Sequence, residues 1–373
     1  MNDNLAAKNT QQPAFESLEA VNLYTKVAQR QYQLPTDMLD KIVMMLNRVD
    51  GLIKSGNYKE YEPIENYLNW ILRIPFGAYL EEDIDIANAK SMLDANHYGL
   101  EDVKSKVIEY LSVIKLNILA QKDVSIELKK INAPVLLFLG IQGIGKTTMA
   151  KSIADALNRQ FVRISLGGMA SVSEIRGVTR GFTSSEPGQI IKALINTRCM
   201  DPVILFDELD KISESGGTRL DIMASLLEIL DPEQNGSFVD RYVDHPVDIS
   251  KCLFICTANN IGGISSALLD RMEIVRFTSY SDEDKKQIAK NYLLPKILKI
   301  SGLGNTQLMF NEDVWELIIR PLGFDAGIRE LERTLTNITR KVARKIVENQ
   351  GSSFEVNKNN FREYIPDDFG IYA

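Results

Sequence analysis

Gly140-Ile141-Gln142-Gly143-Ile144-Gly145-Lys146-Thr147 is the stretch that decides the fold of this chain. It has the spacing G-x-x-x-x-G-K-[ST], and it lies between the apolar run Val135–Leu139 and an amphipathic segment, residues 148–157. In a strand, glycine turn and helix of this kind, successive backbone N–H groups point inward and cradle phosphate oxygens at the positive end of the helix. A chance glycine-rich turn would not need all three parts. The sequence therefore predicts a nucleoside triphosphate site.

Individual residues of this loop have predicted roles. The Lys146 ammonium would reach the β- and γ-phosphates, and the Thr147 hydroxyl would bind Mg²⁺. We expect ATP and Mg²⁺ as cofactors, with nucleotide contacts from Gly140, Gly143, Gly145, Lys146, Thr147 and Thr148.

A second motif consists of the apolar residues 203–206 followed by Asp207 and Glu208. At the carboxyl edge of a parallel sheet, Asp207 would lie beside Thr147 and hold Mg²⁺ directly or through water. Glu208 would then polarise the water that attacks the γ-phosphate. An acid pair after a strand is common by itself, but an upstream phosphate loop makes the combination specific.

Three further polar residues follow strand ends or begin a helix. Asn259 either positions the attacking water from the side opposite Glu208 or is a plain turn asparagine. Arg271 is either a surface ion-pair partner or a residue that reaches a neighbouring subunit's nucleotide. Arg329 would contact the γ-phosphate and couple the domain angle to the nucleotide state.

Composition limits the remaining classes. The 373 residues are 45% hydrophobic and 25% charged with a net charge of −7, which is ordinary for a soluble globular protein. This acidic balance gives no general attraction to nucleic acid or anionic membrane, so we expect neither as a partner. The N-terminus has no signal-peptide pattern, and no apolar run is long enough to span a bilayer. The three cysteines lack metal-site spacing, and we expect a reduced, cytoplasmic location.

Strand-like apolar runs alternate with helical segments in the middle of the chain, which predicts an α/β fold with a doubly wound parallel sheet. We expect a disordered tail (1–16), a helical extension (17–78), a nucleotide-binding domain (79–277) and a small, mostly helical domain (278–373). Two short runs of the small domain, 307–310 and 354–356, are expected to pair. The strands expected in the sheet are 135–139, 161–166, 203–206, 253–257 and 274–277.

The five motifs in this order resemble the AAA+ ATPase pattern. The resemblance narrows to the ATPase portion of Lon proteases and covers nearly all of the chain after about residue 17. Long phrases outside the nucleotide motifs carry it: Tyr67-Leu68-Asn69-Trp70, His97-Tyr98-Gly99-Leu100 and residues 161–168, 230–235 and 269–273.

The resemblance implies an AAA+ P-loop fold with a lid domain, and an ATP-driven homo-hexameric ring that threads unfolded or damaged protein. By position, Lys146 and Thr147 become Walker A, Asp207 and Glu208 Walker B, and Asn259 sensor 1. Arg271 becomes the trans-acting arginine finger and Arg329 sensor 2. The adenine pocket would be lined by His97 and Tyr98 and closed by Tyr292. The loop 177–188 resembles the family's pore loop, with an exposed Phe182 as its grip and Thr183 where a bulky apolar residue is usual.

Lon proteases continue into a peptidase domain with a Ser–Lys dyad, and no residue here can be assigned as its nucleophile. We therefore expect an ATP hydrolase without a peptidase site, which works as a protein unfoldase in degradation or quality control, with a separately encoded peptidase as a further partner. The alternatives are the ATPase fragment of a complete Lon protease, a nucleotide-gated DNA remodeller, and an inactive scaffold.

Overall fold

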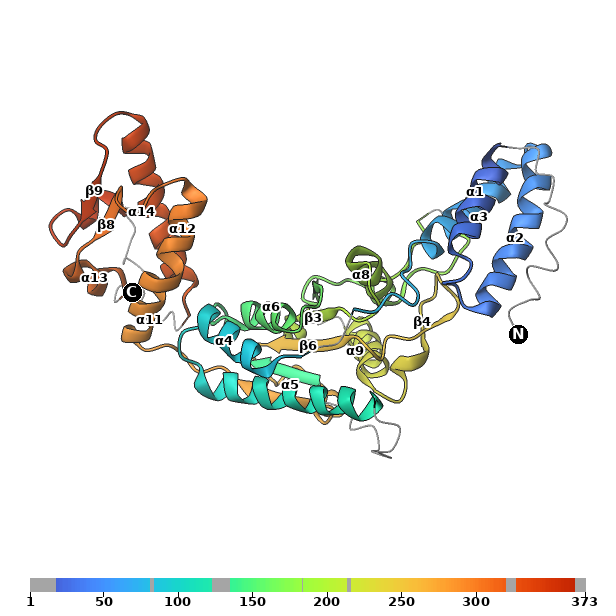
Figure 1. The fold of residues 1–373 in the computed structure, drawn as a ribbon, viewed down its shortest axis with the longest axis horizontal. Coiled ribbons are helices and arrows are strands. Elements are labelled where there is room, and N and C mark those ends of the chain that lie inside the picture. The colour runs from blue at the N-terminus through green and yellow to red at the C-terminus, as the bar shows by residue number, and fades with distance from the viewer. Residues whose placement is uncertain are drawn as a thin grey trace. The chain divides into compact units, whose positions relative to one another are not determined.

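The computed structural model describes residues 18–80, 84–122, 135–182, 184–212, 216–319 and 327–365 (Figure 1). The chain divides into two compact units. The first comprises Met1–Glu81, Met169–Pro202 and Ser213–Leu253, and the second Glu82–Gly168, Val203–Ile212 and Phe254–Ala373. This division does not follow the expected boundaries at 78 and 277, which stay predictions. The expected disordered tail, 1–16, lies outside the described residues.

The second unit is built around a five-stranded sheet with the order β2-β3-β6-β1-β7. β1 pairs in parallel with both β6 and β7, and β2 pairs in parallel with β3. Every residue of β1, β3 and β6 is buried, which explains why all of them except Asp207 and Thr257 are apolar. The predicted parallel α/β sheet is confirmed, with strand ends displaced by at most two residues. The strands are β1 (Val135–Leu139), β2 (Phe161–Ser165), β3 (Val203–Asp207), β6 (Leu253–Ala258) and β7 (Met272–Arg276).

Helices flank this sheet (Figure 1). α6 packs against β2, β3 and α4, while α5 contacts β7. Because β1 ends at Leu139 and α6 begins at Lys146, the glycine loop lies at the carboxyl edge of the sheet, where ligands of open α/β folds bind. The helices are α4 (Ile86–Asn96), α5 (Glu101–Lys122), α6 (Lys146–Ala156) and α10 (Ser266–Leu269), with a 3₁₀ turn at Leu209–Lys211.

The C-terminal part of the second unit is the lid. Its β8 and β9 pair in parallel, as the sequence predicted, and tie its two ends together. Trp315, Leu331 and Leu335 are buried in its core, and the Trp315 and Phe310 ring centroids are 5.2 Å apart. Its elements are α11 (Asp282–Ile288), a π-helical turn (Ala289–Leu293), α12 (Leu294–Ser301), β8 (Leu308–Phe310), a 3₁₀ turn (Glu312–Val314), α13 (Trp315–Ile319), α14 (Arg329–Val347), β9 (Phe354–Val356) and α15 (Phe361–Tyr364).

The first unit contains the helical extension together with two segments from the middle of the chain. Ile42, Leu46, Leu68 and Ile71 form part of its buried core, because they recur on one face of their helices. Its elements are α1 (Leu18–Arg30), α2 (Thr36–Lys54), α3 (Tyr58–Ile71), α7 (Ser173–Arg176), α8 (Gln189–Thr197), α9 (Gly216–Leu230), a 3₁₀ turn (Asn235–Ser237), β4 (Phe238–Val239) and β5 (Pro246–Val247). The last two strands pair antiparallel.

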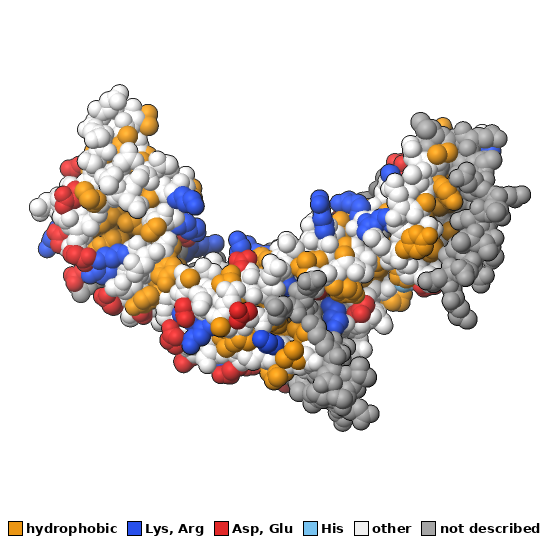
Figure 2. Space-filling model, in the orientation of Figure 1, with side chains coloured by type: hydrophobic (Ala, Val, Ile, Leu, Met, Phe, Trp, Pro, Cys, Tyr) orange, Lys and Arg blue, Asp and Glu red, His pale blue; other side chains and the backbone are white. Residues whose placement is uncertain are grey.

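On the face drawn in Figure 2, apolar, acidic and basic side chains are interspersed. Among the helices of the described ranges, none combines the length and the hydrophobicity needed to cross a bilayer.

Candidate functional site

A cavity of about 330 Å³ lies where the glycine loop meets the carboxyl ends of the central strands. Side chains from β2, β3, β6 and α14 line it together with the loop. The cavity thus gathers residues that are more than 180 positions apart in the sequence, from Gln142 to Glu332. Nine predicted site residues line it: Gly143, Gly145, Lys146, Thr147, Thr148, Asp207, Glu208, Asn259 and Arg329.

The backbone of the loop has the predicted curled form. Gly143 and Gly145 have φ of +80° and +98°, a region that residues with a Cβ rarely adopt. A Cβ on Gly143 would also lie 3.1 Å from the Arg329 Cβ. The Tyr280 hydroxyl donates to the Ile144 carbonyl at 3.0 Å, which fixes the loop from the lid side.

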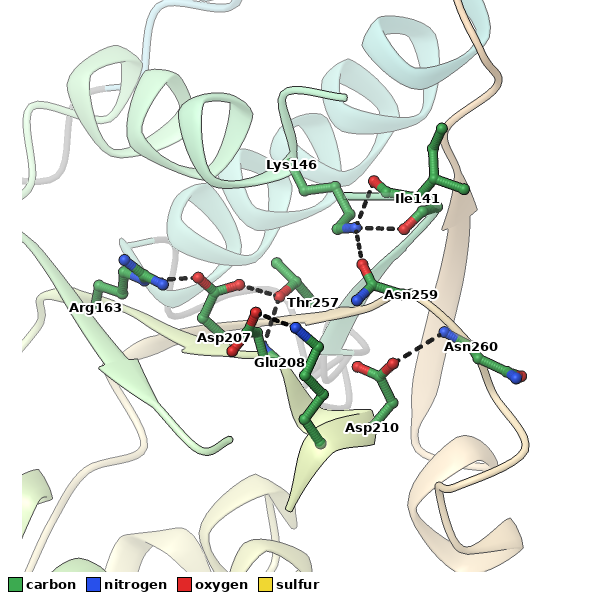
Figure 3. A network of polar contacts seen from close by, with 11 residues as sticks. Ile141, Lys146, Arg163, Asp207, Glu208, Asp210, Thr257, Asn259 and Asn260 are labelled. Atoms are coloured by element: carbon green, nitrogen blue, oxygen red, sulfur yellow. Dashed lines mark hydrogen bonds and ion pairs between the residues drawn. The ribbon is translucent and has the colours of Figure 1, made fainter. Parts of the chain in front are cut away.

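Lys146 is buried at the mouth of the loop. Its Nζ donates to the Gly140 carbonyl, to the Ile141 carbonyl at 3.0 Å and to Asn259 Oδ1 at 2.8 Å (Figure 3). Burial lowers the pKa of Lys146, while the nearby carboxylates, Asp207 first among them, act in the opposite direction. Its acceptors are neutral oxygens. Phosphate oxygens would form stronger, charge-assisted bonds with the same ammonium, so the residue fits a phosphate.

Asp207 is held by two side chains from neighbouring strands. Arg163 Nε lies 2.6 Å from Asp207 Oδ2, and the Thr257 hydroxyl donates to Oδ1. Thr257 Oγ1 also accepts the Glu208 N–H at 3.0 Å, so the β6 residue connects both acids (Figure 3). Neither Arg163 nor Thr257 was predicted from the sequence to be a site residue. An arginine inside an otherwise apolar strand is the signal that would have identified Arg163.

Glu208 follows β3 in a strained conformation. Its φ of +62° lies in the left-handed region, which costs a non-glycine residue about 1–2 kcal/mol. Its Oε1 lies 2.6 Å from Lys211 Nζ. Such strain gathers where a side chain must be aimed, which supports a functional role for this carboxylate. Lys211 was also missed, although its i,i+3 spacing from Glu208 was a usable signal.

The donor set also fits Mg²⁺. The Thr147 hydroxyl and the Asp207 carboxylate both line the cavity and offer hard oxygen ligands. Across the described ranges, no cluster of three or more His, Cys, Asp or Glu residues forms a complete metal cage. Mg²⁺ does not require one, because it usually keeps several waters and binds one or two carboxylates plus phosphate oxygens.

The two predicted arginines have different environments. Arg329 begins α14 and lines the cavity, and the neighbouring Ile328 N–H donates to the Gly143 carbonyl at 3.0 Å. The lid therefore contacts the phosphate loop directly. Arg271 is exposed between α10 and β7 and is not part of the cavity lining. Its Nη1 donates to the Ala267 carbonyl at 3.3 Å.

The three residues expected around adenine lie outside the lining of this cavity. His97 is buried, with Nε2 3.0 Å from Ser152 Oγ on α6. Tyr98 packs against the lid core, and the Tyr292 hydroxyl donates to the Asp94 carbonyl at 3.3 Å. These contacts join α4 to α6 and to the lid. Their adenine contacts stay a prediction.

The Phe182 side chain is 69% exposed, in agreement with the exposed position expected from the sequence. Thr183, the second residue of the expected pore-loop pair, lies outside the described residues.

The sequence matches two family descriptions. Residues 136–280 match "ATPase family associated with various cellular activities (AAA)", and residues 299–354 match "Lon protease AAA+ ATPase lid domain". The first match contains the phosphate loop, both acids and Asn259, and the second contains Arg329.

Curated relatives are similar along most of the chain. The mitochondrial Lon protease homolog of Homo sapiens is 39% identical over 332 residues, which is 89% of this chain and 33% of that protein. Lon protease 2 of Thermus thermophilus is 43% identical over 333 residues, 89% of this chain and 41% of that protein. The mitochondrial Lon protease homolog 1 of Dictyostelium discoideum is 42% identical over 306 residues, which is 82% of this chain and 31% of that protein.

The chain thus spans about a third of the length of these relatives. This protein belongs to the Lon family of AAA+ proteins, of which it carries the ATPase and lid portion.

Proposed function

We propose that this protein is an ATP-binding and ATP-hydrolysing motor that unfolds and translocates protein substrates in ATP-dependent protein degradation or quality control. One observation supports it above all. The glycine loop, the two acids and Asn259 lie at the carboxyl ends of separate strands and line one cavity. Relatives of similar sequence are named Lon proteases.

The chain's own residues divide the chemistry among them. Lys146 places a positive charge against the phosphates, and the α6 N-terminus adds its dipole. Asp207 and Thr147 would hold Mg²⁺, which supplies further positive charge to phosphate oxygens. Glu208 accepts a proton from the attacking water. Asn259, whose Oδ1 accepts a hydrogen bond from Lys146, holds that water in line with the γ-phosphate. Arg329 stabilises the γ-phosphate from the lid.

We further propose that six copies form a ring in which Arg271 completes the neighbouring copy's site. Exposure of Arg271, outside its own cavity, supports this role. The motor serves a peptidase either as part of the same polypeptide or as a separate partner. We keep the cytoplasm as its proposed location, although two of the relatives carry "mitochondrial" in their names.

Phe182 is the proposed grip on the substrate. A single exposed aromatic ring on a loop can contact many polypeptide sequences, because its contact is apolar and not specific to one side chain.

Three variants test the proposal. Glu208→Gln should still bind nucleotide but turn ATP over about 100-fold more slowly or worse, because an amide cannot accept the proton. Lys146→Ala should weaken nucleotide binding roughly tenfold or more. Phe182→Ala should keep basal ATP turnover and lose unfolding of a green fluorescent protein that carries a long unstructured tail. Normal turnover in Glu208→Gln would refute the mechanism, and normal unfolding in Phe182→Ala would refute the grip.

A further inference from the structure

The loop that carries Phe182, residues 177–188 between α7 and α8, has a fixed base. The Asp240 carboxylate is fully buried there and accepts three backbone N–H groups. They come from Gly188 at 2.7 Å, Tyr242 at 2.8 Å and Val243 at 3.0 Å. Across the base, the Val178 N–H donates to the Glu186 carbonyl at 3.0 Å.

The tip of this loop is closed by Ser185. Its hydroxyl donates to the Thr179 carbonyl at 2.8 Å and accepts the Phe182 N–H at 3.1 Å. Its own N–H donates to the Phe182 carbonyl at 3.1 Å. Because these bonds join both sides of the turn, we expect Thr179, Phe182 and Ser185 to move together.

Arg180 links this tip to the helical extension. Its guanidinium carbon lies 4.4 Å from the centroid of the Tyr67 ring on α3, and its Nη2 lies 2.8 Å from Asp244 Oδ2. Tyr67 is itself immobilised, since it is buried and its hydroxyl donates to the Val243 carbonyl at 3.0 Å. Arginine suits this position because its plane stacks on a ring while its N–H groups bind a carboxylate.

The partners of Arg180 belong to one packed group within the first unit. The Tyr67 and Tyr242 ring centroids are 5.9 Å apart. His245 follows Asp244 in the sequence, and its Nε2 lies 2.8 Å from Asp37 Oδ2 on α2. Residues 242–245 are therefore bound to α2 and α3, and Arg180 joins the Phe182 tip to that group.

We propose that Arg180 is a positioning residue that holds the tip of the loop, with Phe182, at a fixed position relative to α3. This inference rests on the proposed function, in which Phe182 grips a polypeptide. Arg180 does not contact the substrate. It transmits the pull on Phe182 to the helical extension, and a displacement of α3 moves the grip.

The test compares full-length Arg180→Ala, Arg180→Lys and Phe182→Ala with the unmodified protein. Arg241→Ala is the matched control, since Arg241 is an exposed arginine of the neighbouring segment. Hydrogen exchange of residues 177–188, basal ATP turnover and unfolding of the tailed green fluorescent protein are measured on each.

Arg180→Ala should speed exchange in the loop roughly tenfold, because an ion pair and a stacking contact are lost together. The rate at which Arg180→Ala unfolds the tailed green fluorescent protein should fall, while its basal ATP turnover stays unchanged. Arg180→Lys should lie between, because lysine keeps the charge and loses the planar stack. Arg241→Ala should behave as the unmodified protein.

The inference is overturned if Arg180→Ala leaves loop exchange unchanged, whether or not unfolding falls, since a loss without loosening would mean direct substrate contact. If Arg180→Ala unfolds the tailed green fluorescent protein normally while Phe182→Ala fails to do so, only the inference about Arg180 is overturned. Normal unfolding by Phe182→Ala would instead refute the grip itself.

Discussion

Arg163 would compete with a bound Mg²⁺ ion for the Asp207 carboxylate. Its guanidinium lies 2.6 Å from Asp207 Oδ2, and its side chain is 51% exposed at the cavity. The electrostatic interaction energy between two unit charges about 4 Å apart near a protein surface is roughly 1–4 kcal/mol. Solvent screening reduces this energy toward the lower value.

Arg163→Ala should therefore lower the Mg²⁺ concentration needed for half-maximal nucleotide binding, by about fivefold for roughly 1 kcal/mol. Binding of a fluorescent ATP analogue, titrated with Mg²⁺ from an EDTA-treated sample, measures the shift. Arg163→Lys should resemble the unmodified protein, because it keeps the charge. An unchanged or higher Mg²⁺ requirement in the alanine variant would mean that Arg163 does not oppose the metal.

His97 gives the stability of the protein a dependence on pH. Burial, followed by the charge of Lys104, lowers the pKa of His97 from 6.5 to about 4. Between these two values the unfolded chain binds a proton that the folded protein excludes. The contribution of His97 is therefore fully present above pH 6.5 and is lost as the pH falls toward 4.

The upper bound of this loss is roughly 3 kcal/mol, from 1.36 kcal/mol per pKa unit. His97→Gln keeps a neutral partner for Ser152 Oγ and should flatten the decline of the unfolding free energy between pH 6.5 and 4. Urea unfolding at several pH values measures it. An equally steep decline in the variant would assign the pH dependence to other groups.

At the scale of elements, the segment around Asp240 ties β4 to the base of the Phe182 loop. A carboxylate has only acceptors, and here its oxygens meet three backbone N–H groups. In Asp240→Asn the amide NH₂ would face at least one N–H, so a buried donor would be left without an acceptor. We expect the free energy of unfolding to fall by about 2 kcal/mol.

Chemical denaturation of both proteins measures this cost. Asp244→Asn is the control, because Asp244 is exposed and its ion pair with Arg180 should contribute less than about 1 kcal/mol. Equal costs for the two variants would show that burial of Asp240 does not decide the effect.

The elements could be predicted because their signals are local. β1 is an uninterrupted apolar run of five residues, β3 and β6 each begin with four apolar residues, and the glycine loop has its own spacing. The position of Asp207 after an apolar run, at the carboxyl edge of a parallel sheet, also predicted that it lies beside Thr147, and both residues line the cavity. The contacts of Arg163 could not be read in this way, because they depend on the pairing of β2 with β3 and on the direction of one long side chain. The strained φ of Glu208 likewise has no sequence signal, since any residue type can occupy the position after a strand.

At the scale of the whole molecule, the question is whether one copy holds a complete active site. Lys146, Glu208, Asn259 and Arg329 share one cavity, whereas Arg271 lies outside its lining and is exposed. In P-loop NTPases an arginine, supplied by the same chain or by another one, can raise kcat about 10³- to 10⁵-fold. The exposed position of Arg271 is consistent with the proposed ring, in which neighbouring copies share the site.

A mixing experiment decides between an arginine that acts on its own copy and one that acts on its neighbour. Arg271→Ala has an intact Glu208, and Glu208→Gln has an intact Arg271, and each variant alone should be nearly inactive. In a randomly mixed ring of equal amounts, about one site in four combines an intact glutamate with a neighbour's intact arginine, so ATP turnover should recover to about a quarter of the unmodified rate. An arginine acting within its own copy would give no recovery at any ratio, because neither polypeptide would then contain a complete site. Mixing Lys146→Ala with Glu208→Gln is the control and should stay inactive, since both variants damage the nucleotide cavity itself.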